Sequence, residues 1–116
     1  MNQDEPKIII KKGNKPGKTV AIFCGIHGNE KAGIMAMDSL IENIEVISGI
    51  VYLVYANTRA IEKGIRFTES NLNRAFIRNK KVSTYEENLS EKLENFPPVE
   101  LELVNGEIYE QKGKIE

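Results

Sequence analysis

Two short apolar runs and the helical stripe between them dominate the hydrophobic pattern of the chain. Residues 19–24 (TVAIFC) and 49–55 (GIVYLVY) are rich in β-forming residues, which is typical of buried strands. Residues 30–43 lie between these runs, and Asn29 is a plausible N-cap for a helix there. Its apolar stripe at helical spacing consists of Ile34, Met37, Leu40, Ile41 and Ile44. Strand, helix and strand in this order predict a right-handed βαβ unit with parallel strands.

Weaker patterns predict the elements around this unit. Residues 7–11 read as a short strand, and the Pro-Gly pair within residues 14–17 predicts a turn. Residues 84–95 read as a second helix, since Thr84 and Glu87 have the spacing of a capping box and two prolines follow the helix.

The end of the chain predicts a hairpin. Residues 99–104 (VELELV) alternate apolar and acidic side chains, as an edge strand does. Asn105-Gly106 is a strong turn signal, after which residues 107–110 could return. We therefore expect one α/β domain over residues 1–116, with a small, mostly parallel sheet and flanking helices in residues 1–96 and the hairpin in residues 97–116.

Composition narrows the class of protein. The 116 residues fit one domain, and 41% hydrophobic with 28% charged residues is ordinary for a globular protein. A net charge of −1 offers no global field for nucleic acid or a membrane, and we expect neither as a partner. The single cysteine, the acidic N-terminal residues and the lack of a membrane-spanning apolar run favour the cytoplasm.

The first candidate site is the sequence Gly-Ile-His-Gly-Asn-Glu at residues 25–30, where a strand gives way to a helix. Ligands bind in this crevice of α/β sheets. His27 and Glu30 can converge there, and an imidazole and a carboxylate are suitable zinc ligands. A loop histidine beside a Glu placed for the helix dipole is the plainer reading, and spacing alone favours it.

The second candidate site lies in the basic segment 59–81, which holds seven basic residues against two acidic ones. A stretch this long with little regular structure, apart from a short helix around residues 59–63, usually carries function. Arg59 and Arg74 could bind carboxylates in bidentate fashion, and Asn73 offers a donor and an acceptor. A surface loop with scattered arginines remains the alternative.

Taken together, these segments resemble a known family. GIHGNE, NTRAIEKGIRF and NLNRAF match, in order and spacing, the succinylglutamate desuccinylase/aspartoacylase family of the zinc carboxypeptidase-like superfamily. Its members carry G-x-H-G-N-E, N-P-R-A and D-L-N-R, followed by a helix like that at Thr84. The resemblance covers roughly residues 18–94, and three ordered motifs make it specific.

The resemblance implies a role for each matched residue. His27 and Glu30 would be two of three Zn²⁺ ligands, and Arg59 would be the catalytic residue that polarises the scissile carbonyl. Asn73 and Arg74 would bind the substrate carboxylate. Zinc lowers the pKa of a bound water in such sites, and a carboxylate base assists its attack on the amide.

Several departures from the family pattern suggest a shortened member. No histidine follows His27, so the third zinc ligand has no match, and the general-base Glu has none either. Thr58 stands where the family has Pro, and Asn71 replaces the Asp of D-L-N-R, which removes a charge. The C-terminal stretch resembles the end of an aspartoacylase-like chain, in which Tyr109 would match a substrate-binding tyrosine.

We therefore expect a zinc-dependent hydrolase that cleaves the amide bond of a small anionic N-acyl amino acid, with the isolated chain inactive. Two alternatives stay open. One is a non-catalytic remnant that binds carboxylates or a partner, and the other is half of a split enzyme, completed by a complementing chain or by a homo-oligomer. We interpret Cys24 as a buried strand cysteine, and Glu86, Glu87 and Glu91 as a solvated helix face rather than catalytic carboxylates.

Overall fold

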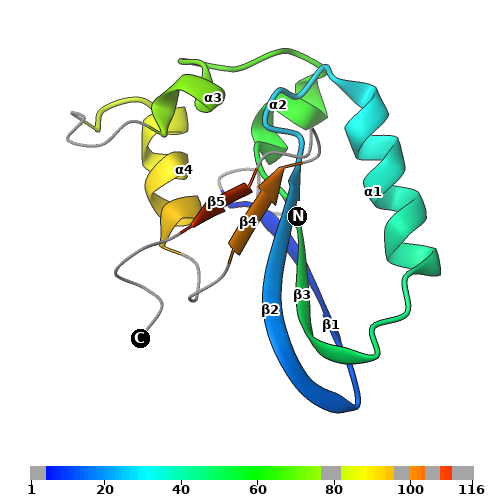
Figure 1. The fold of residues 1–116 in the computed structure, drawn as a ribbon. Helices are drawn as coiled ribbons and strands as arrows, with labels where there is room; N and C mark the ends of the chain where they lie inside the picture. Colours follow the sequence, from blue (N-terminus) through cyan, green and yellow to red (C-terminus); the bar gives the residue numbers. More distant parts are fainter. Residues whose placement is uncertain (1–4, 77–81, 96–99, 104–107, 111–116) are drawn as a thin grey trace.

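A computed structural model describes residues 5–76, 82–95, 100–103 and 108–110 (Figure 1). The strands are β1 (Lys7–Lys12), β2 (Lys15–Cys24), β3 (Ser48–Tyr55), β4 (Glu100–Leu103) and β5 (Ile108–Glu110). The helices are α1 (Lys31–Asn43), α2 (Thr58–Lys63), α3 (Leu72–Ala75) and α4 (Tyr85–Glu94). No helix in the described ranges is long and apolar enough to cross a bilayer.

The βαβ unit formed by β2, α1 and β3 is confirmed. The two strands run parallel and pair in register from Thr19 with Ile50 to Cys24 with Tyr55. The predicted turn at residues 14–17 is wrong, because β2 already begins at Lys15 and its register shifts between Lys15 and Thr19. Proline and glycine mark an irregular start of the strand here, as they do at bulges.

The α/β class is confirmed, but the sheet is mixed rather than mostly parallel. The strand order is β1-β3-β2-β4-β5. The pairs β2–β3 and β2–β4 are parallel, whereas β1–β3 and β4–β5 are antiparallel. The alternation of side chains along a strand fixes its two faces but not its direction relative to a neighbour, so the sequence could not reveal these orientations.

The helices cover both faces of the sheet, as Figure 1 shows with α1 on one side and α3 and α4 on the other. Alternate residues of β2 and β3 belong to different cores, because successive side chains point to opposite faces. Ala21, Phe23 and Val54 pack with Leu89 and Leu93 of α4. The other core comprises Cys24, Met37, Leu53 and Tyr55, against which the predicted stripe of α1 packs.

The C-terminal strands pair antiparallel, as the predicted hairpin requires. The proposed turn at residues 105–106 lies outside the described residues. The prediction of an edge strand at residues 99–104 is wrong, since β4 lies between β2 and β5. The alternation of apolar and polar side chains indicates which face of a strand meets solvent. It does not indicate whether both backbone edges of that strand are paired.

Candidate active site

His27 lies in the turn between β2 and α1, three residues beyond the end of the strand. Its position there is confirmed, and only 7% of its surface is exposed. Gly28 explains how the turn is packed, because a Cβ atom on it would lie 2.1 Å from the backbone carbon of Ala60 in α2. Gly25 has φ +68°, a conformation that favours glycine. The glycines on either side of His27 thus let the turn fold tightly against α2.

Glu30 is the N-cap of α1, so the predictions of Asn29 at that position and of Glu30 inside the helix are wrong by one residue. Its side chain makes no capping hydrogen bond. Instead, its Oε2 atom lies 3.2 Å from His27 Nδ1 and 3.7 Å from a guanidinium nitrogen of Arg66. The carboxylate therefore turns away from the helix end toward a histidine and an arginine, and Arg66 joins the site unpredicted.

The contact with Asn71 determines whether Nε2 of the His27 ring carries a hydrogen. Its side-chain Oδ1 accepts a hydrogen bond from the backbone N–H of Asn73 at 3.0 Å, which identifies this atom as the oxygen. The same oxygen lies 2.7 Å from His27 Nε2. An oxygen that can only accept requires Nε2 to carry a hydrogen and donate it.

The other ring nitrogen of His27, Nδ1, then faces the carboxylate of Glu30. With Nε2 protonated, a neutral His27 would point the Nδ1 lone pair at the Glu30 carboxylate, and two acceptors repel each other. The contact becomes favourable if Nδ1 takes a proton or if a cation binds both atoms. Two ligands of a tetrahedral zinc ion with bonds of about 2.0–2.1 Å stand about 3.3 Å apart. The observed 3.2 Å between Nδ1 and Oε2 fits such a pair.

The two residues would fill half of a tetrahedral zinc site. In the part of the chain that the structure describes, no group of three His, Cys, Asp or Glu side chains is placed to hold a metal ion. Cys24, three residues before His27, packs in the core with Met37, Leu53 and Tyr55. Burial first and then the charge of Asp38 raise the pKa of its thiol to about 12. The remaining positions on a bound zinc would fall to water or to groups from elsewhere.

Arg59 is held on α2 by contacts that fix its plane. The side chain of Asn57 caps this helix by accepting from the N–H of Ala60 at 3.1 Å. The guanidinium carbon of Arg59 lies 3.8 Å from the centre of the Tyr85 ring, and one of its nitrogens lies 3.6 Å from Glu69 Oε2. Arg59 is therefore oriented by an aromatic face and a carboxylate from the second candidate segment.

Asn73 and Arg74 lie on α3, and both are exposed. Asn71 is the N-cap of this short helix, so the oxygen that binds His27 also anchors the helix carrying these two residues. The convergence of their side chains with Arg59 on His27 stays a prediction. Tyr109 belongs to β5, but its side chain lies outside the described part of the chain.

The expectation of a solvated helix face is wrong for Glu86. None of its surface is exposed. Burial alone would raise the pKa of its carboxyl, but hydrogen bonds from Thr68, Asn57 and Ser70 outweigh burial and lower the pKa to about 2. Helical spacing could have found it, because residue 86 shares the face of the buried Leu89 and Leu93.

The neighbouring Glu87 has a different role. Its side chain completes the predicted capping box with Thr84, which is confirmed. Hydrogen bonds from the backbone of Thr84 and Ser83 lower the pKa of its carboxyl. Glu87 is thus committed to the start of α4.

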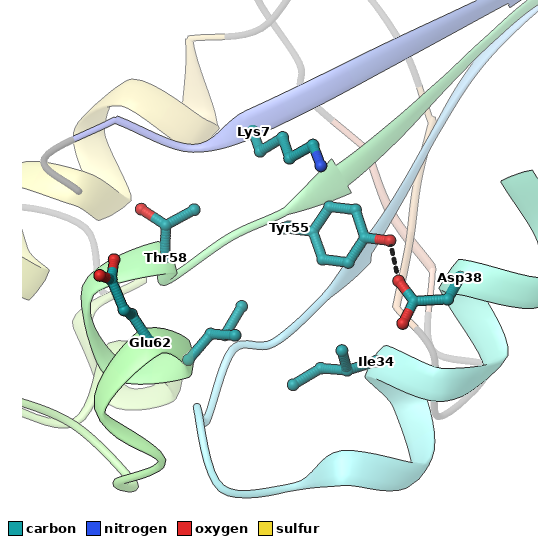
Figure 2. A pocket seen from close by; sticks show the side chains of 7 residues that line it. Lys7, Ile34, Asp38, Tyr55, Thr58 and Glu62 are labelled. Atoms are coloured by element: carbon teal, nitrogen blue, oxygen red, sulfur yellow. Dashed lines mark hydrogen bonds between the residues drawn. The ribbon is translucent and has the colours of Figure 1, made fainter. Parts of the chain in front are cut away.

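A separate hollow of about 470 Å³ opens near α1, α2 and the end of β3 (Figure 2). Its walls are formed by Lys7, Ile34, Asp38, Tyr55, Thr58, Ile61 and Glu62. Figure 2 shows the Tyr55 hydroxyl directed at Asp38, to which it donates a hydrogen bond. None of the predicted site residues lines this hollow, so it does not belong to the candidate site.

Comparisons with known proteins bear on the same segments. The profile of the succinylglutamate desuccinylase/aspartoacylase catalytic domain matches residues 16–98. An aspartoacylase from Danio rerio is 45% identical over 62 residues, which are 51% of this chain and 20% of that protein. A succinylglutamate desuccinylase from Shewanella piezotolerans is 34% identical over 74 residues, 60% of this chain and 21% of that protein.

A solved structure agrees with these matches. The succinylglutamate desuccinylase from Vibrio parahaemolyticus superimposes with a TM-score of 0.66 at 29% identity, over 74% of this chain and 28% of that one. The chain spans about a fifth of the length of the two curated relatives. The profile includes His27, Glu30, Arg59, Asn73 and Arg74, whereas Tyr109 lies beyond it.

Proposed function

Because the chain belongs to the succinylglutamate desuccinylase/aspartoacylase family, we propose that it supplies two zinc ligands and the substrate-carboxylate site of an enzyme that hydrolyses N-acyl amino acids. The observation that carries this proposal is the pair formed by His27 and Glu30. Their ligand atoms stand 3.2 Å apart, and Asn71 holds the opposite ring nitrogen. Such an outer hydrogen bond orients a metal-binding histidine and fixes its tautomer.

On the metal side, His27 Nδ1 and the Glu30 carboxylate would hold Zn²⁺. Zinc bound there would supply an activated water at neutral pH. The chain's own part is to keep both ligands in place: Asn71 accepts from Nε2, and Arg66 lies close enough to Glu30 to orient its carboxylate. The tight turn against α2 limits movement of the imidazole.

On the substrate side, Arg59 would polarise the scissile carbonyl and stabilise the oxyanion that forms from it. Its stacking on Tyr85 fixes the plane of the guanidinium, and a substrate oxygen would replace its long contact with Glu69. Asn73 and Arg74 would bind the substrate carboxylate, with Tyr109 as a further contact. The names of the relatives support a small anionic N-acyl amino acid as the substrate class.

The isolated chain is proposed to be inactive. A metal-activated water, a base and an oxyanion partner act as a unit, so the loss of one removes most of the rate. The described residues offer Arg59 and two metal ligands, and Glu86 is too well bonded to serve as the base. A complementing chain or a second copy would have to supply the missing groups. The rival function is a non-catalytic domain that binds carboxylates or a partner.

Zinc calorimetry on the 116-residue chain tests this proposal. Two protein ligands should bind zinc far more weakly than a complete site, and His27→Ala should abolish that binding. Glu62→Gln, which changes a carboxylate beside the separate hollow, is the matched control and should leave it unchanged. Zinc binding that survives His27→Ala would refute the assignment and favour the rival function.

A further inference from the structure

Glu86 binds five hydrogen-bond donors in the interior of the protein. One carboxylate oxygen accepts from the backbone N–H groups of Glu69 and Ser70, at 2.9 and 3.0 Å. The other accepts from Thr68 twice, through its N–H and its hydroxyl, both at 2.8 Å, and from Asn57 Nδ2 at 3.0 Å. The three consecutive backbone N–H groups form a nest around one anion.

This environment determines what Glu86 can do chemically. A carboxylate offers about four lone-pair positions, and five donors occupy them. No position remains from which Glu86 could take a proton from a substrate water. The buried negative charge serves to hold Asn57, which caps α2, and residues 68–70, which directly precede the N-cap of α3.

The first connection from Glu86 leads to Arg59. Asn57 donates to Glu86 through its amide nitrogen and caps α2 through its amide oxygen, so one side chain joins the carboxylate to the helix of Arg59. Glu69, whose N–H is bound by Glu86, reaches Arg59 with its own carboxylate. Tyr85, the residue before Glu86, supplies the ring on which Arg59 stacks.

The second connection leads to His27. Ser70, whose N–H is bound by Glu86, directly precedes Asn71. Asn71 accepts from His27 and caps α3, on which Asn73 and Arg74 lie. The buried Glu86 carboxylate therefore holds residues that lead to Arg59 on one side and to Asn71, the partner of His27, on the other.

We propose that Glu86 is a positioning residue whose ionised carboxylate fixes Asn57 and residues 68–70, and thereby sets the places of Arg59 and Asn71 in the site. This inference rests on the proposed function and adds to it a group that touches neither metal nor substrate. A purely structural Glu86 would affect only the stability of the protein. A positioning Glu86 also controls anion binding under conditions in which the chain stays folded.

The test compares Glu86→Gln with Glu91→Gln in the full chain. Glu91 lies on the same helix, and the substitution makes the same chemical change outside the cradle formed by Glu86, Asn57 and residues 68–70. In Glu86→Gln, the new side-chain amide would point an NH₂ group at two or more donors. All measurements are made below the unfolding temperature of each variant. NMR follows hydrogen exchange of the backbone amides and the signals of the Arg59 guanidinium and the Asn71 side chain. Titration with N-acetylaspartate gives the affinity for an anionic ligand.

We expect Glu86→Gln to lower hydrogen-exchange protection of Thr68, Glu69 and Ser70 by at least about tenfold, since each charged hydrogen bond lost is worth that much. N-acetylaspartate affinity should fall by about tenfold, because binding must then fix side chains that are no longer held in place. The Arg59 and Asn71 signals should move, and the amides of β1 and α1 should stay in place. Glu91→Gln should change none of these. If Glu86→Gln does not fold, Glu86→Asp keeps the charge but withdraws it by one methylene, and should give the same local pattern.

Unchanged signals from Arg59 and Asn71 in a folded variant would overturn the proposal, as would unchanged affinity beside a displaced 68–70 segment. A wild-type chain that binds no N-acetylaspartate contradicts the proposed function. In that case the Arg59 and Asn71 signals still decide whether Glu86 positions them, so the two failures are distinguishable.

Discussion

Glu30 and Glu86 are two carboxylates of the same candidate site in opposite situations. The Glu30 side chain is 61% exposed, and its closest contact is a histidine nitrogen 3.2 Å away. Glu86 is fully buried, and its two oxygens receive five hydrogen bonds. The first has lone pairs to offer a metal ion, whereas the second has none left. The surroundings of each carboxylate, rather than its residue type, therefore determine whether it can bind a metal ion or instead holds other parts of the chain in place.

The largest expected difference between them is in stability. Glu86→Gln should lower the free energy of unfolding by about 3 kcal/mol, since it leaves buried donors facing an NH₂ group. Glu30→Gln should change it by less than about 1 kcal/mol, because the Glu30 side chain is mostly exposed. Urea unfolding of both variants measures the contrast. Equal losses of unfolding free energy in the two variants would show that burial and hydrogen bonding do not distinguish Glu86 from Glu30.

Acid should remove the contribution of Glu86. Its pKa is about 2 in the folded protein, against an ordinary value of 4.5. A carboxyl whose pKa is lowered by folding stabilises the protein above the unfolded value and loses that effect as pH falls toward the folded one. The contribution is up to about 3 kcal/mol at neutral pH.

The wild-type chain and Glu86→Gln should therefore differ most above pH 5 and converge as the pH approaches 2. Denaturant unfolding at several pH values gives the difference at each. A gap that stays constant over this range would mean that the charge of Glu86 contributes nothing.

These two carboxylates also show what the sequence could reveal. His27 and Glu30 lie three residues apart at the junction of a strand and a helix, so local spacing predicts their meeting. Asn71 lies 44 residues from His27, and only the folded chain brings the two together. Glu86 shares a helical face with Leu89 and Leu93, so its burial could be predicted. Its partners at residues 68–70 could not, because main-chain donors leave no mark in a sequence.

The same limit applies to the sheet. Apolar runs predicted β2 and β3 and their parallel pairing through α1, since the connecting helix dictates that direction. The antiparallel attachment of β1 and the inner position of β4 depend on backbone hydrogen bonds that alternating side chains do not encode.

A smaller effect is expected at Asn71. Asn71→Leu removes the acceptor for His27 Nε2 and should weaken zinc binding by about tenfold or more, as expected for the loss of an outer-shell partner. Asn71→Asp adds a negative charge beside the imidazole and should strengthen zinc binding. Calorimetry with zinc on both variants checks the order. Equal affinities would show that the contact with Asn71 does not prepare His27 for a metal.

The central claim is that His27 presents Nδ1 to a cation while Nε2 donates to Asn71. His27 is the only histidine in the chain, so its two ring ¹⁵N signals are identified without assignment by mutation. A long-range ¹H–¹⁵N NMR experiment during zinc titration reads both nitrogens. The predicted result is a protonated Nε2 throughout and a zinc-dependent shift of Nδ1. Loss of the Nε2 proton on zinc binding, or no change at either nitrogen at millimolar zinc, would contradict the account.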